Sequence, residues 1–254
     1  MKRTWVILML GIAAAVTVAA QTAGGANPAA LSGPNVLDYI VNPNSIVFSR
    51  TFSEWDAEWQ QWAYSIPVAD HPLFDNGDCS VGQSGTVWFL GGKFCNNGSP
   101  SCSYTAVQRN CKVPHGKYLY FPVANGEDSF LEESTAENPG NIDAQQINAM
   151  RQLEDPLTNS PSTEFATIDG VLVPNLMQYS IQSTVFGFTI PYDNYLNVVY
   201  SPLTFAPGWY YPAVDQGQYL MLQPLPPGRH TIHFGAQWSS GFKFDVTYFL
   251  NVQK

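Results

Sequence analysis

Charged residues are scarce in this chain, and basic residues are the scarcest: 12% of the 254 residues are charged, with 11 Lys and Arg against 20 Asp and Glu. The formal net charge is therefore -9. A chain with so few cations repels phosphate backbones, so we expect no nucleic-acid partner. Aromatic residues, at 14%, outnumber the charged ones. This combination is typical of a folded, aromatic-rich β protein and excludes a disordered chain.

Long apolar segments are absent after residue 20, so the sequence predicts no membrane span beyond that point. The first twenty residues carry Lys2 and Arg3, then an uncharged apolar stretch, then small residues up to Ala20. This order is that of a cleaved signal peptide spanning residues 1–20. The apolar stretch is shorter than the ~20 residues of a comfortable span, which disfavours a membrane anchor. We expect a secreted or periplasmic protein.

Residues 21–34 have no charge and no hydrophobic periodicity, and they consist mainly of Ala, Gly, Pro and Asn with small polar residues. This composition predicts a flexible leader. The remaining residues, 35–254, show no internal repeat and no abrupt change in composition. We therefore expect them to form a single domain.

Cysteine is confined to four positions between residues 79 and 111. Four cysteines allow three pairings, and an exported chain without a C-x-x-C motif favours disulfides over a metal site. A turn-forming run rich in Asn, Gly, Ser and Pro separates Cys95 from Cys102 and can bring the two together. The preferred pairing is therefore nested, with Cys95–Cys102 inside Cys79–Cys111.

Helical signals are few. Trp55, Trp59 and Trp62 are spaced to lie on one face of a short helix, for which Ser53 is a suitable N-cap. We interpret this tryptophan stripe as the face of the helix that packs on the core, the alternative being an aromatic groove for a ligand. A second helix is predicted to begin at Asp143, from a capping-box pattern, and to end before Pro156.

Strand signals dominate the second half of the chain. Asp169 and Gly170 separate two short β-type segments, which is a strong hairpin signal. Residues 242–252 alternate apolar and polar side chains, as expected for a strand with one buried face. Residues 125–143 are rich in acidic residues and predict a surface excursion. The expected fold is mainly β: an antiparallel β-sandwich, jelly-roll or immunoglobulin-like, with two short helices.

Three segments are similar to a recurring pattern in secreted bacterial proteins. They are GQSGTVWFL at residues 82–90, CKVPHGK at residues 111–117 and PLPPGRHTIHF at residues 224–234. The chain resembles this family of uncharacterised secreted proteins over most of residues 55–252. The resemblance implies a bacterial exported protein, and it implies no activity and no catalytic residue.

Metal ligands are sparse. His230 and His233 stand three apart on a predicted strand and so point to opposite faces, which disfavours a zinc site. No cofactor is predicted, except that acidic loops could hold calcium, which takes oxygen ligands. The calcium candidates, weighed against simple solvated loops, are Asp75, Asp78, Glu127 and Asp128, with Asp70, Glu132 and Glu133 in the same two segments.

No catalytic signature is present. The nearest approach to a nucleophile elbow surrounds Ser84, but its second glycine is misplaced and it precedes a strand. Paired carboxylates that cleave glycosides need a defined separation across a cleft, which spacing in sequence does not reveal. The nominal candidates for such a pair are Glu54, Glu58, Glu127 and Asp128.

The strongest ligand signal is the run Trp209, Tyr210 and Tyr211, bounded by Pro and Gly. Three consecutive aromatic residues cannot share one face of a strand, so we expect a loop with at least one exposed ring. Exposed Trp and Tyr suit stacking on sugars. The sequence therefore favours a non-catalytic binding protein for a glycan or another cell-envelope component. The alternatives are a secreted glycan hydrolase and a structural or adhesive envelope protein, and packing of all three rings in the core would leave no site.

Overall fold

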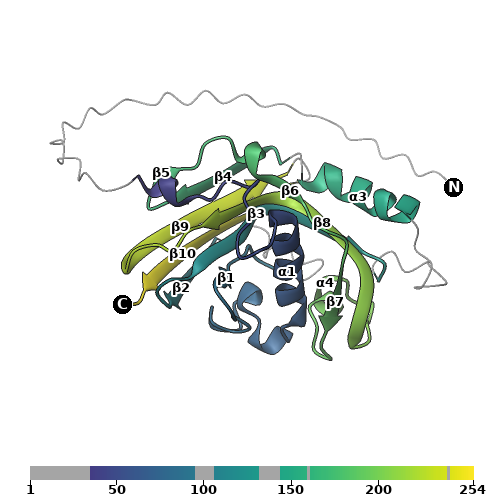
Figure 1. Ribbon diagram of the computed structural model, residues 1–254. Helices are drawn as coiled ribbons and strands as arrows, with labels where there is room; N and C mark the ends of the chain where they lie inside the picture. Colours follow the sequence, from purple (N-terminus) through teal and green to yellow (C-terminus); the bar gives the residue numbers. More distant parts are fainter. Residues whose placement is uncertain (1–34, 95–105, 132–143, 159–160, 239–240) are drawn as a thin grey trace, which may run out of the picture. The chain divides into compact units, whose positions relative to one another are not determined.

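The computed structural model describes residues 35–94, 106–131, 144–158, 161–238 and 241–254, with the side chains of 153–158 left aside (Figure 1). The expected signal peptide, the leader and the Cys95–Cys102 disulfide lie outside these residues. So do Glu132 and Glu133. Within the described ranges, no helix combines the length and the apolar character that crossing a membrane requires.

Strands form two five-stranded sheets. The first has the order β1-β3-β8-β6, with β7 also paired to β8. Its strands are β1 (Val87–Phe89), β3 (Tyr118–Ser129), β6 (Ser180–Gln182), β7 (Phe186–Ile190) and β8 (Gly208–Leu222). The second sheet has the order β2-β10-β9-β4-β5. Its strands are β2 (Val107–Val113), β4 (Thr163–Ile168), β5 (Val171–Leu172), β9 (Gly228–Gln237) and β10 (Lys243–Val252).

Both sheets are mixed, so the expectation of a purely antiparallel sandwich is wrong. β1 runs parallel to β3, and β2 runs parallel to β10. The chain passes from β1 to β2 in the other sheet before it returns to β3, so β1 and β3 can point the same way. Side-chain alternation reports which face of a strand is buried and carries no information on the direction of its neighbour. The prediction of a mainly β, sandwich-like fold is confirmed.

The core between the two sheets is apolar. Phe121 and Leu220 from the first sheet meet Phe234 and Tyr248 from the second in one buried cluster. On β10, the residues predicted to be buried from Val246 to Val252 alternate with more exposed ones, which confirms the pattern. The hairpin at Asp169 and Gly170 is also confirmed: β4 and β5 pair antiparallel across it.

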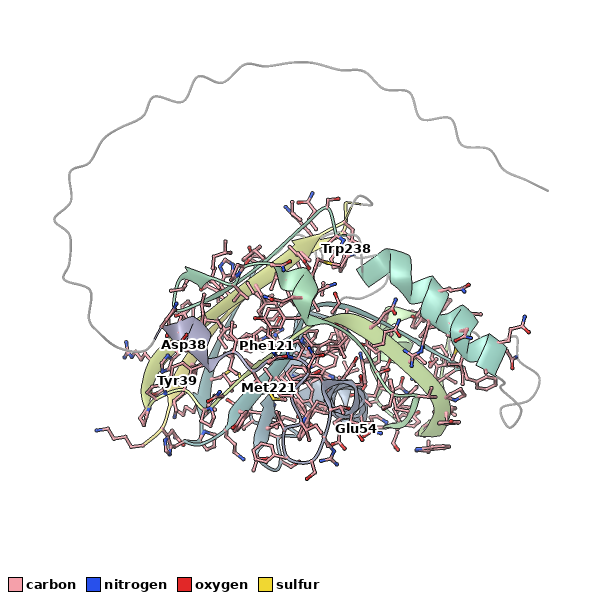
Figure 2. The ribbon with its side chains drawn as sticks, turned by 45° about the horizontal axis from the view of Figure 1, so that its top comes forward. Asp38, Tyr39, Glu54, Phe121, Met221 and Trp238 are labelled. Atoms are coloured by element: carbon pink, nitrogen blue, oxygen red, sulfur yellow. A yellow bond between two sulfur atoms is a disulfide. The ribbon has the colours of Figure 1, made fainter. Side chains whose placement is uncertain are left out.

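Helix α1 (Phe52–Ser65) covers the opposite face of the first sheet, so the layers run from sheet to sheet to helix (Figure 1). Its three tryptophans are buried, which confirms that the stripe packs on the core. Met221 belongs to this second cluster and Phe121 to the first, and Figure 2 labels both among the packed side chains. The N-cap is Thr51 rather than Ser53, because Thr51 and Glu54 complete a reciprocal capping box.

The described residues contain three α-helices where two were expected. α3 (Ala144–Thr158) packs on β3 and β8 and continues past Pro156, and its predicted start at Asp143 lies outside the described ranges. The unexpected helix is α4 (Leu196–Val199), a single turn. Residues 125–129 of the predicted acidic excursion belong instead to β3, and residues 132–143 lie outside the described ranges. The described part of the chain also contains four short 3-10 helices: η1 (Val36–Tyr39), η2 (Val68–Asp70), η3 (Pro72–Phe74) and η4 (Leu176–Tyr179).

A disulfide joins Cys79 to Cys111, as predicted, with 5.6 Å between their Cα atoms. Two residues before Cys111, the guanidinium of Arg109 is buried. It pairs with Asp75 at 2.7 Å and donates to the hydroxyl of Tyr248 at 2.6 Å. A buried charge is tolerated because these partners compensate its desolvation. The loop that precedes β1 is thereby tied to the second sheet by one covalent and several polar links.

Candidate functional site

The aromatic run predicted to form a loop lies instead on β8, at the start of the strand. The side chains alternate: Trp209 is 65% exposed and Tyr211 45% exposed, while Tyr210 turns inward and its ring lies 6.2 Å from that of Phe188. The loop prediction is wrong because β7 pairs with this segment from Gly208 to Ala213, despite the Gly and Pro that bound the aromatic run. The prediction that at least one ring is exposed is confirmed.

Trp209 and Tyr211 together form what we call the aromatic platform. Their rings are parallel, with centroids 5.7 Å apart and planes 3° apart. The indole lies over the neighbouring strand at Gly187, where an added Cβ would come within 2.5 Å of the ring. Thr189, also exposed, pairs with Trp209 in the register of β7 and β8. The absence of a side chain at 187 therefore lets the indole approach the backbone of β7, with Thr189 on the same strand.

The candidate acids occupy structural positions near the two ends of α1. Glu54 accepts from the backbone N–H of Thr51 at 2.7 Å, and these hydrogen bonds lower its pKa. Glu58 forms a salt bridge of 2.9 Å with Arg50. Glu127 on β3 instead accepts from the hydroxyl of Tyr64, in the last turn of α1. Asp128, the next residue on β3, is buried.

The calcium candidates are engaged separately. Asp75 pairs with Arg109. Asp78 accepts from the backbone N–H of Ser80 at 2.9 Å, and the Ser80 side chain, followed by this backbone hydrogen bond, lowers the pKa of Asp78. Over the ranges that the structure describes, no group of three or more His, Cys, Asp or Glu side chains is arranged to hold a metal ion.

The histidines also act in hydrogen bonds. His230 lies 2.7 Å from Asp169 and 2.9 Å from the carbonyl of Pro226, as expected for a structural histidine beside a turn. His233 lies 2.9 Å from Asp245. His71, fully buried, contacts the carbonyl of Ala63 at 2.8 Å, and burial lowers its pKa to about 4.

The sequence interpretation missed a buried carboxyl pair. Asp56 on α1 and Asp215 on β8 are both 0% exposed and face one another between the helix and the first sheet. Asp215 accepts from Tyr219 at 2.6 Å and from Gln60 at 2.6 Å. Asn125 on β3 donates to the same carboxyl at 2.9 Å. Three donors thus converge on one carboxylate.

Asp56 has no such donors. Within the described residues, neither of its oxygens accepts from an N–H or O–H group, so a hydrogen bond between the two carboxyls needs a proton on one of them. Burial, then the neighbouring Asp215, raises the pKa of Asp56 well above its usual range. Burial also raises the pKa of Asp215, to about 6. Both shifts favour a proton shared between the two carboxyls, and the distribution of donors suits Asp56 as its donor and Asp215 as its acceptor.

A signal for Asp56 was present in the helical periodicity. Phe52, Trp59 and Ala63 stand at i−4, i+3 and i+7 from it, so the carboxyl shares the buried face of α1. An acidic residue near the start of a helix is also expected from the helix dipole alone, so its residue type gives no separate sign of burial. Asp215 carried no comparable signal, because its partner comes from an element 159 residues earlier (215 − 56 = 159).

Comparison with known proteins gives no assignment: no family model, no curated protein and no solved structure matches this chain.

Proposed function

We propose that the protein binds an extracellular or periplasmic glycan, or another cell-envelope component with flat saccharide faces, through the aromatic platform. The observation that supports this proposal is the pair of parallel, exposed rings on one face of β8. A sugar ring presents C–H groups that stack on Trp and Tyr, and both side chains also offer a polar group at the ring edge. We retain export, and a jelly-roll or immunoglobulin-like sandwich, as parts of this proposal.

The exposed aromatic area is otherwise costly in water, and it is larger than the single surface rings that soluble proteins tolerate without a function. Gly187 adds to this argument, because the missing side chain at that position lets the indole pack closely against β7. The rings are thus held in place before a ligand arrives, which reduces the entropy that binding must overcome.

The hydrolase alternative has less support. The carboxyl pair with the strongest mutual influence, Asp56 and Asp215, is sealed from solvent, so a glycosidic bond cannot reach it in this structure. Glu58 and Glu54 are engaged in the first turns of α1, and Glu127 is engaged at its far end. Non-catalytic binding needs none of these carboxyls.

Retention of the purified protein on insoluble polysaccharides tests the proposal. Cellulose, chitin and peptidoglycan are the probes, and Trp209→Ala is the variant. We expect about a tenfold weaker Kd on the polysaccharide that retains the parent protein, because one stacked ring contributes roughly 1–1.5 kcal/mol. Trp209→Phe keeps a flat ring and should retain part of the affinity.

The matched control is Phe249→Ala, which removes another exposed ring, 39% accessible, from β10 in the other sheet. Its retention should equal that of the parent protein. If no polysaccharide retains the protein, or if both alanine variants lose retention equally, the platform is not a glycan site. Self-association of the protein that Trp209→Ala abolishes would instead favour the structural or adhesive alternative.

A further inference from the structure

An aromatic pocket separate from the platform is lined by residues of α1, of β3 and of the adjoining ends of β9 and β10. Its volume is about 330 Å³, within the range typical of small-molecule sites. Five rings line it: Trp59, Phe94, Trp238, Phe242 and Phe244. Trp238, at the end of β9, is labelled in Figure 2. The pocket is therefore a concave, mainly apolar cavity, unlike the flat platform on β8.

The pocket forms because β1 is short. β1 pairs only with the segment from Tyr118 to Tyr120, so beyond Tyr120 no described strand covers that edge of β3. Gly92 and Lys93, which follow β1, and Pro122, which lies on β3 beyond Tyr120, line the pocket. A strand edge without a partner, lined by rings rather than by charges, leaves room for a ligand.

The charge of the pocket indicates what it accepts. Lys93 is the only charged side chain among the described lining residues, and it forms no salt bridge within the described part of this acidic chain. A ring-lined cavity alone suits a quaternary ammonium group, but a lysine at its wall repels one. The combination of apolar rings and one ammonium group suits an anion on an apolar body.

The buried carboxyl pair does not change this conclusion. Asn125 lines the pocket and donates its side-chain amide to Asp215, so the amide stands between the cavity and the carboxyls. Neither Asp56 nor Asp215 is a lining residue. The wall that faces a ligand is therefore polar but uncharged on this side, and Lys93 supplies the charge.

We propose that this pocket binds a small carboxylic acid with an apolar body, its carboxylate at Lys93 and its body against the rings. The proposal is independent of the platform, because the two sites share no residue. Fatty acids of medium chain length and aromatic acids share this chemistry. Octanoate and 3-phenylpropionate are the respective probes, with 1-octanol as the neutral and octyltrimethylammonium as the cationic counterpart.

Isothermal titration calorimetry at neutral pH measures the binding of the four ligands. Quenching of the fluorescence of Trp59 and Trp238 by a bound ligand is a second readout. We expect at least one carboxylate to bind more tightly than octanol and the cation to bind weakest. Lys93→Gln should weaken carboxylate binding by roughly tenfold and leave octanol unchanged. Lys112→Gln, an exposed lysine on β2, is the matched control and should change neither.

Gly92 offers a way to close the pocket. An added Cβ there would meet the Phe244 ring at 3.6 Å, an ordinary contact, so Gly92→Leu should fit and block every ligand. Gly92→Ala, which fills little of the cavity, is its control for folding. At the preceding Gly91, an added Cβ would come within 2.8 Å of the Trp59 ring, so Gly91→Ala should disturb the fold itself.

The outcomes separate the two proposals. Trp209→Ala should bind octanoate as the parent protein does, whatever it does on polysaccharides. The pocket proposal is overturned if neither carboxylate binds, if octanol binds as tightly as octanoate and Lys93→Gln changes nothing, or if the cation binds tightest. Tighter binding of octanoate or of 3-phenylpropionate supports the proposal in either case and decides between an acyl and an aromatic body.

Discussion

The two ends of β8 differ in the burial of their side chains. From Gly208 to Tyr211 the strand exposes alternate rings, whereas from Pro212 to Leu222 every residue is buried. The buried part even encloses Asp215, the most polar kind of side chain, while the exposed part presents Trp, one of the most apolar. Residue type therefore does not predict burial along this strand, and what packs on each face does. α1 and the second sheet cover the buried part, and the described residues leave one face of the other end uncovered.

The largest expected effect comes from a substitution in the buried part of β8. Asp215→Ala removes the acceptor of Tyr219, Gln60 and Asn125 and leaves their donors buried without a partner. We expect a loss of roughly 4 kcal/mol or more in the free energy of unfolding, measured by urea denaturation. A loss below about 1 kcal/mol would mean that water reaches these donors and that the cluster is not sealed.

A pH effect of intermediate size tests the shared proton. The folded protein keeps protons on Asp56 and Asp215 at pH values where the unfolded chain, with a pKa near 3.8, has released them. The folded state then binds more protons than the unfolded state, so these two groups make stability fall as pH rises above about 4, by up to ~1.4 kcal/mol per pH unit for each proton. The slope lessens once Asp215 ionises, near pH 6.

His71 opposes this trend below its ordinary pKa, because its lowered pKa makes the stability it contributes fall as pH falls from 6.5 toward 4. Comparison with Asp56→Asn cancels this contribution, since both proteins retain His71. The asparagine amide replaces the shared proton as a donor to Asp215. In urea denaturation, we expect the stability of the variant minus that of the parent protein to increase as pH rises from 5 to 8. Parallel pH profiles would contradict the shared proton.

The smallest expected effect concerns the exposed end. Tyr211→Ala removes one ring of the platform and should cost about 1 kcal/mol or less of stability, because the side chain is half exposed and loses mainly its stacking on Trp209. Thermal denaturation should show nearly the parent midpoint. A cost similar to that of Asp215→Ala would mean that the platform supports the fold, and the contrast between the two ends of β8 would disappear.

Much of the fold could be predicted from local patterns. β10 alternates because one of its faces packs on the first sheet, the hairpin between β4 and β5 follows from Asp169 and Gly170, and the tryptophans of α1 recur at helical spacing. Strand direction could not be predicted in this way, since β1 and β3 become parallel only through a crossover to the other sheet. α4, a single turn, is too short to produce a periodic signal.

The candidate sites also differ in how far local patterns predict them. The sequence predicts an exposed ring but not its strand, because Pro207 and Gly208 indicate a turn and the pairing of β7 with β8 is not local. The aromatic pocket draws its rings from three separate stretches of chain. Trp59 belongs to the tryptophan stripe found by its helical spacing, but no local pattern brings the three stretches together. Only the tertiary structure brings these stretches together around one pocket.

Composition and local periodicity determined that this chain is mainly β, acidic, rich in aromatic residues and able to form the Cys79–Cys111 disulfide, because each of these depends on residues counted or spaced along the chain. Only the tertiary structure decided which polar and aromatic side chains are sealed and which are open. Asp56 and Asp215 are buried against one another, and Trp209 faces solvent, because burial depends on elements that are distant in sequence and adjacent in space.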